Sequence, residues 1–411
     1  DNKLIPESER YPEPVEIYHP FTLNFPRSSV PNNIHLCTFP INEVDPRSYS
    51  ALLSRDIESP ASILCQKISE NLNDNDDLFS FLLRMYKLSS SEEEFEVKTS
   101  SQLLKQNMGL PLEGYGGKKD IHQIIISFSK FNEHPFLDKA NSNLCFTEKK
   151  FKEMLNDWKT VTLFTTWKIE DERLKYFFYI DLLIKLNKLI PKYSRHPVLI
   201  ILEEIKILLP KTTDRGYKKQ LSEIVKEMLA GLRSNSVTIL GTSQSYYQTN
   251  DDFRDGVPSD HVILMKLSHE DIRRMNQDMK INIHNYNQLV GLKEGEYLFM
   301  SDVVGSVIHN KFKCPHVPFG HREPGDGNYL DTYRRIYPEK MTSFKELIDN
   351  KKIEFELCYN EHLSKLQKIS KERKQKSNEK NINNSQKQKE NNEKGENATP
   401  EIRSEEEHTE D

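Results

Sequence analysis

The sequence predicts an α/β fold with a mostly parallel sheet flanked by helices. Short apolar runs typical of buried strands lie at residues 160–167, 198–202, 236–244 and 261–267. Long helical patterns lie at 171–190 and 218–233, between successive runs. Strands that alternate with helices form right-handed crossovers and therefore a parallel sheet covered by helices.

The two helical patterns differ in how their apolar residues are distributed around the helix. The segment at 171–190 is apolar on most of its faces, which predicts a helix packed on several sides. The segment at 218–233 instead places its apolar residues on one stripe, which is typical of a helix lying on a sheet. That stripe consists of Leu221, Ile224, Val225, Met228, Leu229 and Leu232.

The remaining segments predict five regions along the chain. Residues 1–46 are Pro-rich and irregular, with one strand at Asn33–Ile41, and residues 47–150 form a helical insertion. Residues 151–338 form the α/β core, which ends in an antiparallel hairpin turned near 302–305. Residues 339–369 form a C-terminal helical segment. The tail at 370–411 is predicted to be disordered, because it is nearly devoid of apolar residues.

Composition excludes several classes of protein. The five cysteines have no close pair, which excludes a disulfide framework and favours a reducing, cytoplasmic location. No apolar run is long enough to span a bilayer, and no signal-peptide pattern opens the chain. Cys314, His316 and His321 supply three ligands without a fourth, so loop residues are the better interpretation than a zinc site.

Two adjacent carboxylates, Glu203 and Glu204, end the most apolar strand. Ligands bind beyond the carboxyl ends of strands in open parallel sheets. Neighbouring strand residues point to opposite faces, so one acid could hold hydrated Mg²⁺ while the other activates a water for phosphoryl transfer. The alternative is a pair of solvated acids at a strand end.

Two polar residues downstream favour the first interpretation. Gln244 ends the next predicted parallel strand, where an amide can bind both the water and a γ-phosphate. Arg233 lies in the turn before that strand, from which a guanidinium could reach the nucleotide of an adjacent subunit. A cation that stabilises a helix C-terminus is the alternative role for Arg233.

The order "HPVLIILEEIKILLP", "LAGLRSNSVTILGTSQS", "PSDHVILMKLSHEDIRRM" and "LKEGEYLFM" resembles the C-terminal two thirds of the HerA–FtsK superfamily of RecA-like P-loop ATPases. Within it, the chain is similar to archaeal HerA-type DNA translocases and to the related conjugative coupling and secretion ATPases. The resemblance covers about Lys159 to Pro324, with a weaker match near His35. The family has Asp where this chain has Glu203.

The resemblance implies an ATP-dependent DNA translocase or helicase-type motor with ATP and Mg²⁺ as cofactors. It implies Glu203 on the Mg²⁺ side, Glu204 as catalytic base, Gln244 as sensor and Arg233 as a finger acting in trans. It also implies a hexameric ring on duplex DNA, with a nuclease or a secretion or conjugation machinery as possible partner. Lys266, Arg273 and Arg274 could face the DNA, although solvent-facing charge explains each of them alone.

The sequence lacks the Walker A motif G-x-x-x-x-G-K-[ST]. "GYGGKKD" at 114–120 has Leu112 in place of the first Gly and Lys119 in place of Ser or Thr, so we interpret it as a surface loop. Either a phosphate-binding loop lies upstream of Asp1, which we prefer, or the chain is a degenerate, non-hydrolysing scaffold or DNA-processing partner. The enzyme prediction depends on the first alternative.

Overall fold

The computed structural model describes most of the chain outside its first residues, several loops and the last residues. The described residues are 15–89, 118–157, 159–203, 205, 208–209, 216–235, 237–243, 261–273, 283–293, 295–301, 307–313 and 338–395. The chain divides into two compact units, Asp1–Lys352 and Ile353–Asp411. No helix within the described ranges is both long and apolar enough to cross a membrane.

A three-stranded parallel sheet forms near the N-terminus, in the order β3-β1-β6. Its strands are β1 (Val15–Pro20), β3 (Ile34–Cys37) and β6 (Val161–Phe164). In the middle of the sheet, Ile17 pairs with Ile34 on one side and Leu163 on the other. The sequence interpretation missed β1, because its prolines mask a short apolar alternation in "VEIYHP". Pro20 has no N–H to donate, and the pairing with β3 continues at the next residue, where the Phe21 N–H donates to the Cys37 carbonyl at 2.7 Å.

A second parallel pair consists of β7 (Val198–Leu202) and β8 (Val237–Gly241), in register from Val198↔Val237 to Leu202↔Gly241. Helix α7 (Glu172–Tyr193) precedes β7, and α8 (Gly216–Ser234) connects β7 to β8. The α/β class is therefore confirmed, as is the predicted parallel arrangement of the strands at 198–202 and 236–244.

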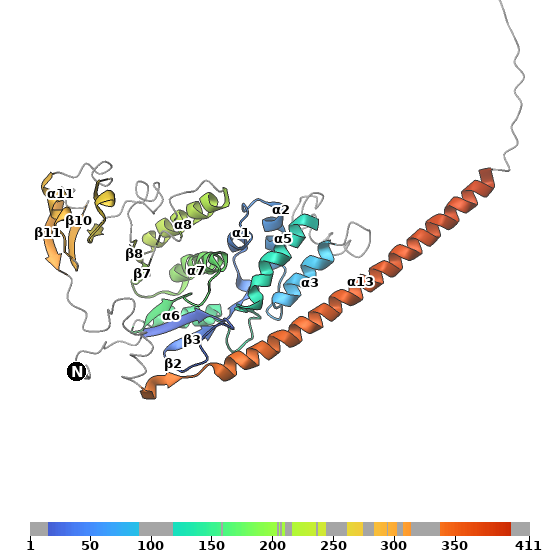
Figure 1. Ribbon diagram of the computed structural model, residues 1–411, viewed down its shortest axis with the longest axis horizontal. Coiled ribbons are helices and arrows are strands. Elements are labelled where there is room, and N and C mark those ends of the chain that lie inside the picture. The colour runs from blue at the N-terminus through green and yellow to red at the C-terminus, as the bar shows by residue number, and fades with distance from the viewer. Residues whose placement is uncertain are drawn as a thin grey trace, which may run out of the picture. The chain divides into compact units, whose positions relative to one another are not determined.

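Helices α7 and α8 lie side by side along one side of β7 and β8 (Figure 1). Their apolar stripes bury Leu174, Phe177, Val225 and Leu232 in one continuous core. The predicted stripe of α8 is buried at each of its positions that the structure describes. The core also receives the inward residues of β7 and β8.

The helices before β6 join the same core. They are α1 (Tyr49–Leu53), α2 (Pro60–Ser69), α3 (Leu78–Ser89), α5 (Lys118–Phe128) and α6 (Glu148–Asn156). Stacked rings of Tyr49, Phe81 and Phe128 join them to Phe177 of α7. The helices predicted at 47–150 therefore share one hydrophobic core with the α/β strands. The exact boundaries predicted at 46, 150 and 338 stay predictions.

Four two-residue strands complete this region. The strand β4 (Phe39–Pro40) pairs in parallel with β5 (Leu137–Asp138). The strand β2 (Val30–Pro31) pairs antiparallel with β12 (Met341–Thr342), so residues about 310 positions apart in the sequence share a ladder. Buried Lys351 binds Asp138 at 2.8 Å and so attaches the beginning of the last helix to the strand β5.

A three-stranded antiparallel sheet in the order β11-β10-β9 has a small core of its own. Its strands are β9 (His261–Leu264), β10 (Glu296–Ser301) and β11 (Val307–Lys313), with α11 (Ile283–Val290) nearby in sequence. The hairpin of β10 and β11 is confirmed, and its turn lies outside the described residues. The prediction that residues 261–267 continue the parallel sheet is wrong, because β9 pairs antiparallel with β10.

The last helix, α13, extends from Lys345 to Gly395. Residues 370–395 are therefore described as helical, while the disordered tail predicted for 370–411 stays a prediction. Lys, Glu and Gln favour a helix even without a core, and pairs such as Lys365–Glu361 at 2.8 Å support it locally. Residues 396–411 lie outside the described ranges.

Candidate functional site

The carboxyl ends of β7 and β8 meet at one edge of their sheet. The Thr242 N–H donates to the Leu202 carbonyl at 2.9 Å, and the Ile205 N–H donates to the Thr242 carbonyl at 2.9 Å. These bonds continue the pairing past Leu202↔Gly241 into both loops. Glu203 lies within this joined edge and is exposed to solvent. Backbone hydrogen bonds therefore hold the carboxyl ends of β7 and β8 together beyond the paired strands.

Buried residues anchor the turn that follows Glu203. Ile205, Leu208 and Leu209 are each less than 7% exposed. The Tyr176 hydroxyl, from α7, donates to the Leu208 carbonyl at 3.1 Å. A Cβ on Gly241 would approach Ile205 Cδ1 to 2.8 Å, so the glycine lets this turn lie directly on β8. The backbone around Glu203 is thus held by hydrogen bonds to the β8 loop and by the buried turn that follows it.

Glu203 also acts electrostatically on a tyrosine of α7. Burial raises the pKa of Tyr179, a hydrogen bond with Thr166 opposes the rise, and the charge of Glu203 adds to it. Tyr179 Oη and Thr166 Oγ1 are 3.0 Å apart. Because Thr166 follows β6, this hydrogen bond connects the carboxyl end of β6 to α7, where Tyr179 is also influenced by the charge of Glu203 at the end of β7.

A second group of side chains gathers where β1 and β6 end. The buried His19 ring donates from Nδ1 to the Pro20 carbonyl at 2.6 Å and accepts at Nε2 from the Lys168 N–H at 3.1 Å. Burial lowers the pKa of His19 to about 4, so the ring is neutral at pH 7. Trp167 packs edge-on against His19 and remains 43% exposed, with Lys168 Nζ at 4.8 Å from its ring centroid.

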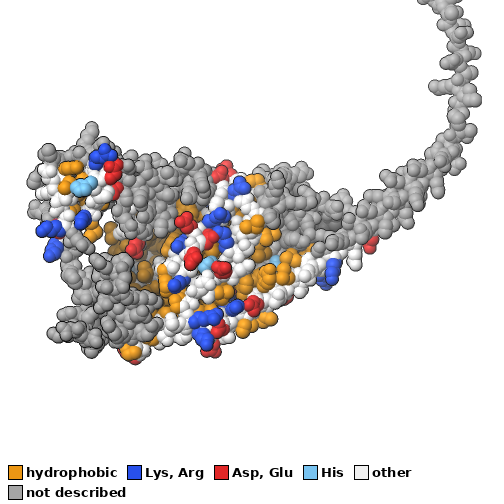
Figure 2. Space-filling model, in the orientation of Figure 1, with side chains coloured by type: hydrophobic (Ala, Val, Ile, Leu, Met, Phe, Trp, Pro, Cys, Tyr) orange, Lys and Arg blue, Asp and Glu red, His pale blue; other side chains and the backbone are white. Residues whose placement is uncertain are grey.

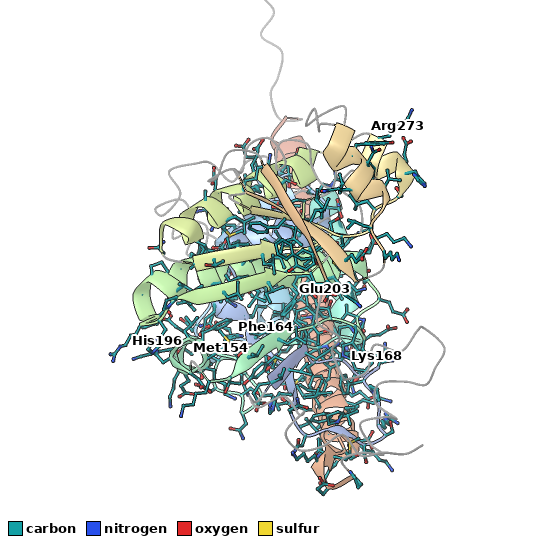
Figure 3. The ribbon with its side chains drawn as sticks, turned by 90° about the vertical axis from the view of Figure 1, so that its left-hand side faces the viewer. Met154, Phe164, Lys168, His196, Glu203 and Arg273 are labelled. Carbon is teal, nitrogen blue, oxygen red and sulfur yellow. The ribbon has the colours of Figure 1, made fainter. Side chains whose placement is uncertain are left out.

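The two groups lie on the same side of the molecule. Glu203 and Lys168 lie toward one side in Figure 3, whereas His196, which precedes β7, lies toward the other. Sequence reasoning missed His19, Trp167 and Lys168, because β1 was not recognised as a strand that ends at this edge.

The predicted site residues are described to different extents. Glu203 is placed at the edge, while Glu204 and Gln244 lie outside the described residues. Thr242 and Ser243, which immediately precede Gln244, are placed beside the β7 turn and are exposed.

Arg233 lies in the last turn of α8, which leads into the amino end of β8. The five residues of β8 separate that end from the Glu203 edge by roughly 16 Å at 3.3 Å per residue. The backbone therefore does not bring Arg233 and Glu203 together within one chain.

The residues at the edge suit Mg²⁺ only with help from a substrate. Among the described residues, no group of three or more His, Cys, Asp or Glu side chains could hold a metal ion. Magnesium in phosphate-binding sites commonly keeps several waters and uses one or two carboxylates plus substrate phosphates. Glu203, exposed and beside the hydroxyl-bearing Thr242 and Ser243, fits that second arrangement.

The other candidate groups fall mostly outside the described residues. This holds for Cys314, His316, His321 and the glycines at 114–117, although Lys118 and Lys119 begin α5. Arg273 pairs with Glu270 at 2.9 Å, which favours its interpretation as a solvent-facing charge. In the view of Figure 2, Lys and Arg side chains lie interspersed with Asp and Glu over the coloured surface.

Comparison with known proteins gives matches among solved structures alone. No protein-family model matches the sequence, and no curated protein matches it. The VirB4 structure of Thermoanaerobacter pseudethanolicus is 11% identical, with a TM-score of 0.44, over 74% of this chain and 77% of that one. The bacterial conjugative coupling protein TrwBΔN70 is 12% identical, with a TM-score of 0.42, over 78% and 77%.

The genome packaging NTPase B204 of Sulfolobus turreted icosahedral virus 2, in complex with AMP, is 15% identical, with a TM-score of 0.29. That match covers 40% of this chain and 72% of the NTPase. The chain is thus similar in structure to a VirB4, to a conjugative coupling protein and, over a smaller part of its length, to a genome packaging NTPase.

Proposed function

We propose that the chain supplies the hydrolytic half of an ATP site in a DNA-translocating motor of the HerA–FtsK type. The observation that carries the proposal is the joined carboxyl edge of β7 and β8. Backbone hydrogen bonds hold Glu203 beside Thr242. In sequence, Glu204 follows Glu203 directly, and Gln244 lies two residues after Thr242. The resemblance of the sequence around these strands supports the same role.

Each residue has a defined role in this proposal. Glu203 holds the water shell of Mg²⁺, which neutralises phosphate charge when bound. Glu204 accepts a proton from the attacking water, and Gln244 orients that water against the γ-phosphate. Arg233, at the opposite end of β8, serves the nucleotide of an adjacent subunit. Its distance from Glu203 along β8 supports action between subunits of a ring, for which we propose a hexamer on duplex DNA.

A phosphate-binding loop must complete the site. Backbone N–H groups at a helix N-terminus are needed to cradle phosphates, and the sequence contains no Walker A motif to provide them. The hydrolytic proposal therefore requires such a loop from another segment. The second candidate function, favoured by the missing motif, is a non-hydrolysing scaffold for a DNA-processing partner.

The test is DNA-stimulated ATP hydrolysis by the protein as its own cells make it. Glu204→Gln is expected to lower the rate by about 10²- to 10⁴-fold, the usual contribution of a general base. Glu223→Gln is the matched control, because Glu223 is exposed on α8 and remote from the strand ends. Equal rates for wild type and Glu204→Gln would contradict the role of Glu204. A wild type without hydrolysis favours the scaffold.

A further inference from the structure

The loop that follows β6 is fixed to the end of β1 by hydrogen bonds. The Thr165 N–H donates to the Tyr18 carbonyl at 3.0 Å, which continues the pairing of β1 with β6. The Lys168 N–H donates to Nε2 of His19 at 3.1 Å, while Nδ1 of that ring donates to the carbonyl of the following residue. Both ring nitrogens of His19 therefore hold backbone in place, and the loop is rigid.

Trp167 presents a large ring to solvent from this rigid loop. Its ring is steeply inclined to those of His19 and Phe25, with centroids 5.9 and 5.5 Å away. Both of these rings are buried, and Phe25 also packs against Phe344. The Trp167 side chain nevertheless remains 43% exposed. Because the buried rings already restrict its rotamer, little conformational entropy is lost when a planar ligand stacks on the exposed part.

Lys168 lies over the same ring and has no acidic partner within the described part of the chain. Its Nζ is 4.8 Å from the centroid of the Trp167 ring. Cation–π contacts at exposed sites are weak, so this ammonium group can leave the ring. The start of α7 offers no anion site, since Asp171 already accepts from the N–H groups of Arg173 and Leu174. An open ring beside a free lysine suits a ligand that has a planar base and a phosphate.

This ring and this lysine lie on the same side of the molecule as Glu203 (Figure 3). Thr166, next to Trp167, is hydrogen-bonded to Tyr179, on which the charge of Glu203 acts. A mononucleotide with its base on Trp167 can therefore direct its phosphates toward the edge that ends β7. A nucleic-acid strand fits less well, because Glu170 and Glu172 beside this loop are exposed and would repel its successive phosphates.

We propose that Trp167 stacks the base of a purine nucleoside triphosphate and that Lys168 leaves the ring to bind the phosphates. This rests on the proposed function in one respect, namely that the nucleotide is the one whose phosphates lie at the Glu203 edge. Stacking recognises a π-face without reading the groups at its rim. The site therefore binds ATP and GTP alike, and CTP more weakly, because a pyrimidine overlaps less of the indole.

The test is nucleotide binding by the protein as its own cells make it, measured by calorimetry with AMP-PNP, an ATP analogue that is not hydrolysed. Trp167→Ala is expected to raise the Kd about 5- to 150-fold, the usual contribution of a stacked base. Trp167→Phe keeps an aromatic ring and should restore most of the affinity. Phe312→Ala is the matched control, because Phe312 is also 43% exposed but belongs to the antiparallel sheet. Equal Kd values for wild type and Trp167→Ala overturn the proposal, as does an equal loss in the Phe variant.

Tryptophan fluorescence separates stacking from a structural role. AMP-PNP and its guanine counterpart should quench the emission, and Trp167→Phe should lack this quenching. Trp158 is the second of the two tryptophans in the sequence, and Trp158→Phe should keep the quenching. Inorganic triphosphate, which has no base, should not quench. Quenching by a single-stranded oligonucleotide but not by either nucleotide would assign the ring to nucleic acid and overturn the proposal. No quenching by any of these ligands overturns it too.

Lys168→Met tests the charge while keeping most of the side-chain length. It should raise the Kd for AMP-PNP about tenfold or more, because a charged hydrogen bond is lost, and leave quenching by adenosine unchanged. Lys149→Met, exposed on α6, is the control. Base-dependent quenching without ATP hydrolysis would overturn the proposed function and leave the base site standing. Hydrolysis whose KM is unchanged in Trp167→Ala would overturn the base site and leave the proposed function standing.

Discussion

Ile200 and Ile201 are neighbours on β7 and experience opposite environments. Ile200 packs inward against the core beneath α7 and α8, whereas Ile201 is 59% exposed. The same alternation continues on β8, where Ile239 packs inward and Leu240 is exposed. The two faces have similar apolar side chains, so side-chain chemistry does not distinguish them. This difference shows that the position of the crossover helices α7 and α8 decides which face of β7 and β8 contributes to the stability of the chain.

The largest effect is expected beneath the covered face. Leu232 of α8 is fully buried, and Leu232→Ala should lower the free energy of unfolding by about 2–5 kcal/mol, through lost burial and the cavity left behind. Urea unfolding followed by circular dichroism measures this. Glu223→Ala, on the exposed side of the same helix, should change the value by less than about 0.5 kcal/mol. Similar losses for both variants would contradict the core assignment of α8.

The next effect concerns pH and the end of β1. The pKa of His19 is lowered by burial from 6.5 to about 4, so the unfolded chain binds more protons than the folded chain between these values. The contribution of the neutral His19 ring to the free energy of unfolding is fully present above pH 6.5. It is lost as the pH falls toward 4, and the loss is at most about 3 kcal/mol. Burial lowers the pKa of His134 in the same direction.

Urea unfolding of wild type and His19→Gln at a series of pH values between 7 and 4.5 measures that contribution. The variant should lose less stability across this range, whatever its stability at pH 7. His196→Gln is the surface control, because His196 is exposed at the other end of β7. Parallel pH curves for wild type and His19→Gln would show that the buried ring does not set the acid sensitivity.

The smallest effect compares the two faces directly on one strand. Ile200→Ala should destabilise the chain by about 1–2 kcal/mol, and Ile201→Ala by less than about 0.5 kcal/mol. Both are measured on residues 1–411 alone, where nothing outside that sequence can cover Ile201. If Ile201→Ala costs as much as Ile200→Ala, the outward face is covered within this chain. The distinction between the two faces would then fail.

The strands of the parallel pair and their helices could be predicted from sequence because their signals are local. The apolar run of β7 and the stripe of α8 are strong, and each matches the period of its element. Strand β1 was missed because only six residues, flanked by prolines, carry its alternation. The pairing of β9 was wrong because an isolated strand pattern contains no information about its neighbour's direction. The helix after residue 370 was missed because the near absence of apolar residues indicates only that the segment has no buried core. It does not exclude a helix that is stabilised locally.

The candidate site shows the same division. Glu203 was predicted at a strand end, and the parallel register places it beside the β8 loop as expected. The charge of Glu203 acts on Tyr179, and Tyr179 is hydrogen-bonded to Thr166. These three residues come from different parts of the chain, and their spacing in the sequence does not predict that they interact. His19 and Trp167 meet across 148 positions of the chain, and their contact depends on β1 pairing with β6. Long-range contacts of this kind follow from pairing rather than from pattern.

By itself, the sequence determined the α/β class, the acid pair at the end of its most apolar strand and the lack of a Walker A motif. These follow from local periodicity and from residue identity. The tertiary structure alone decided which face of β7 and β8 is covered and that β9 belongs to an antiparallel sheet. The physical reason is that strand direction and crossover handedness act between segments, so they become visible only when the strands are paired.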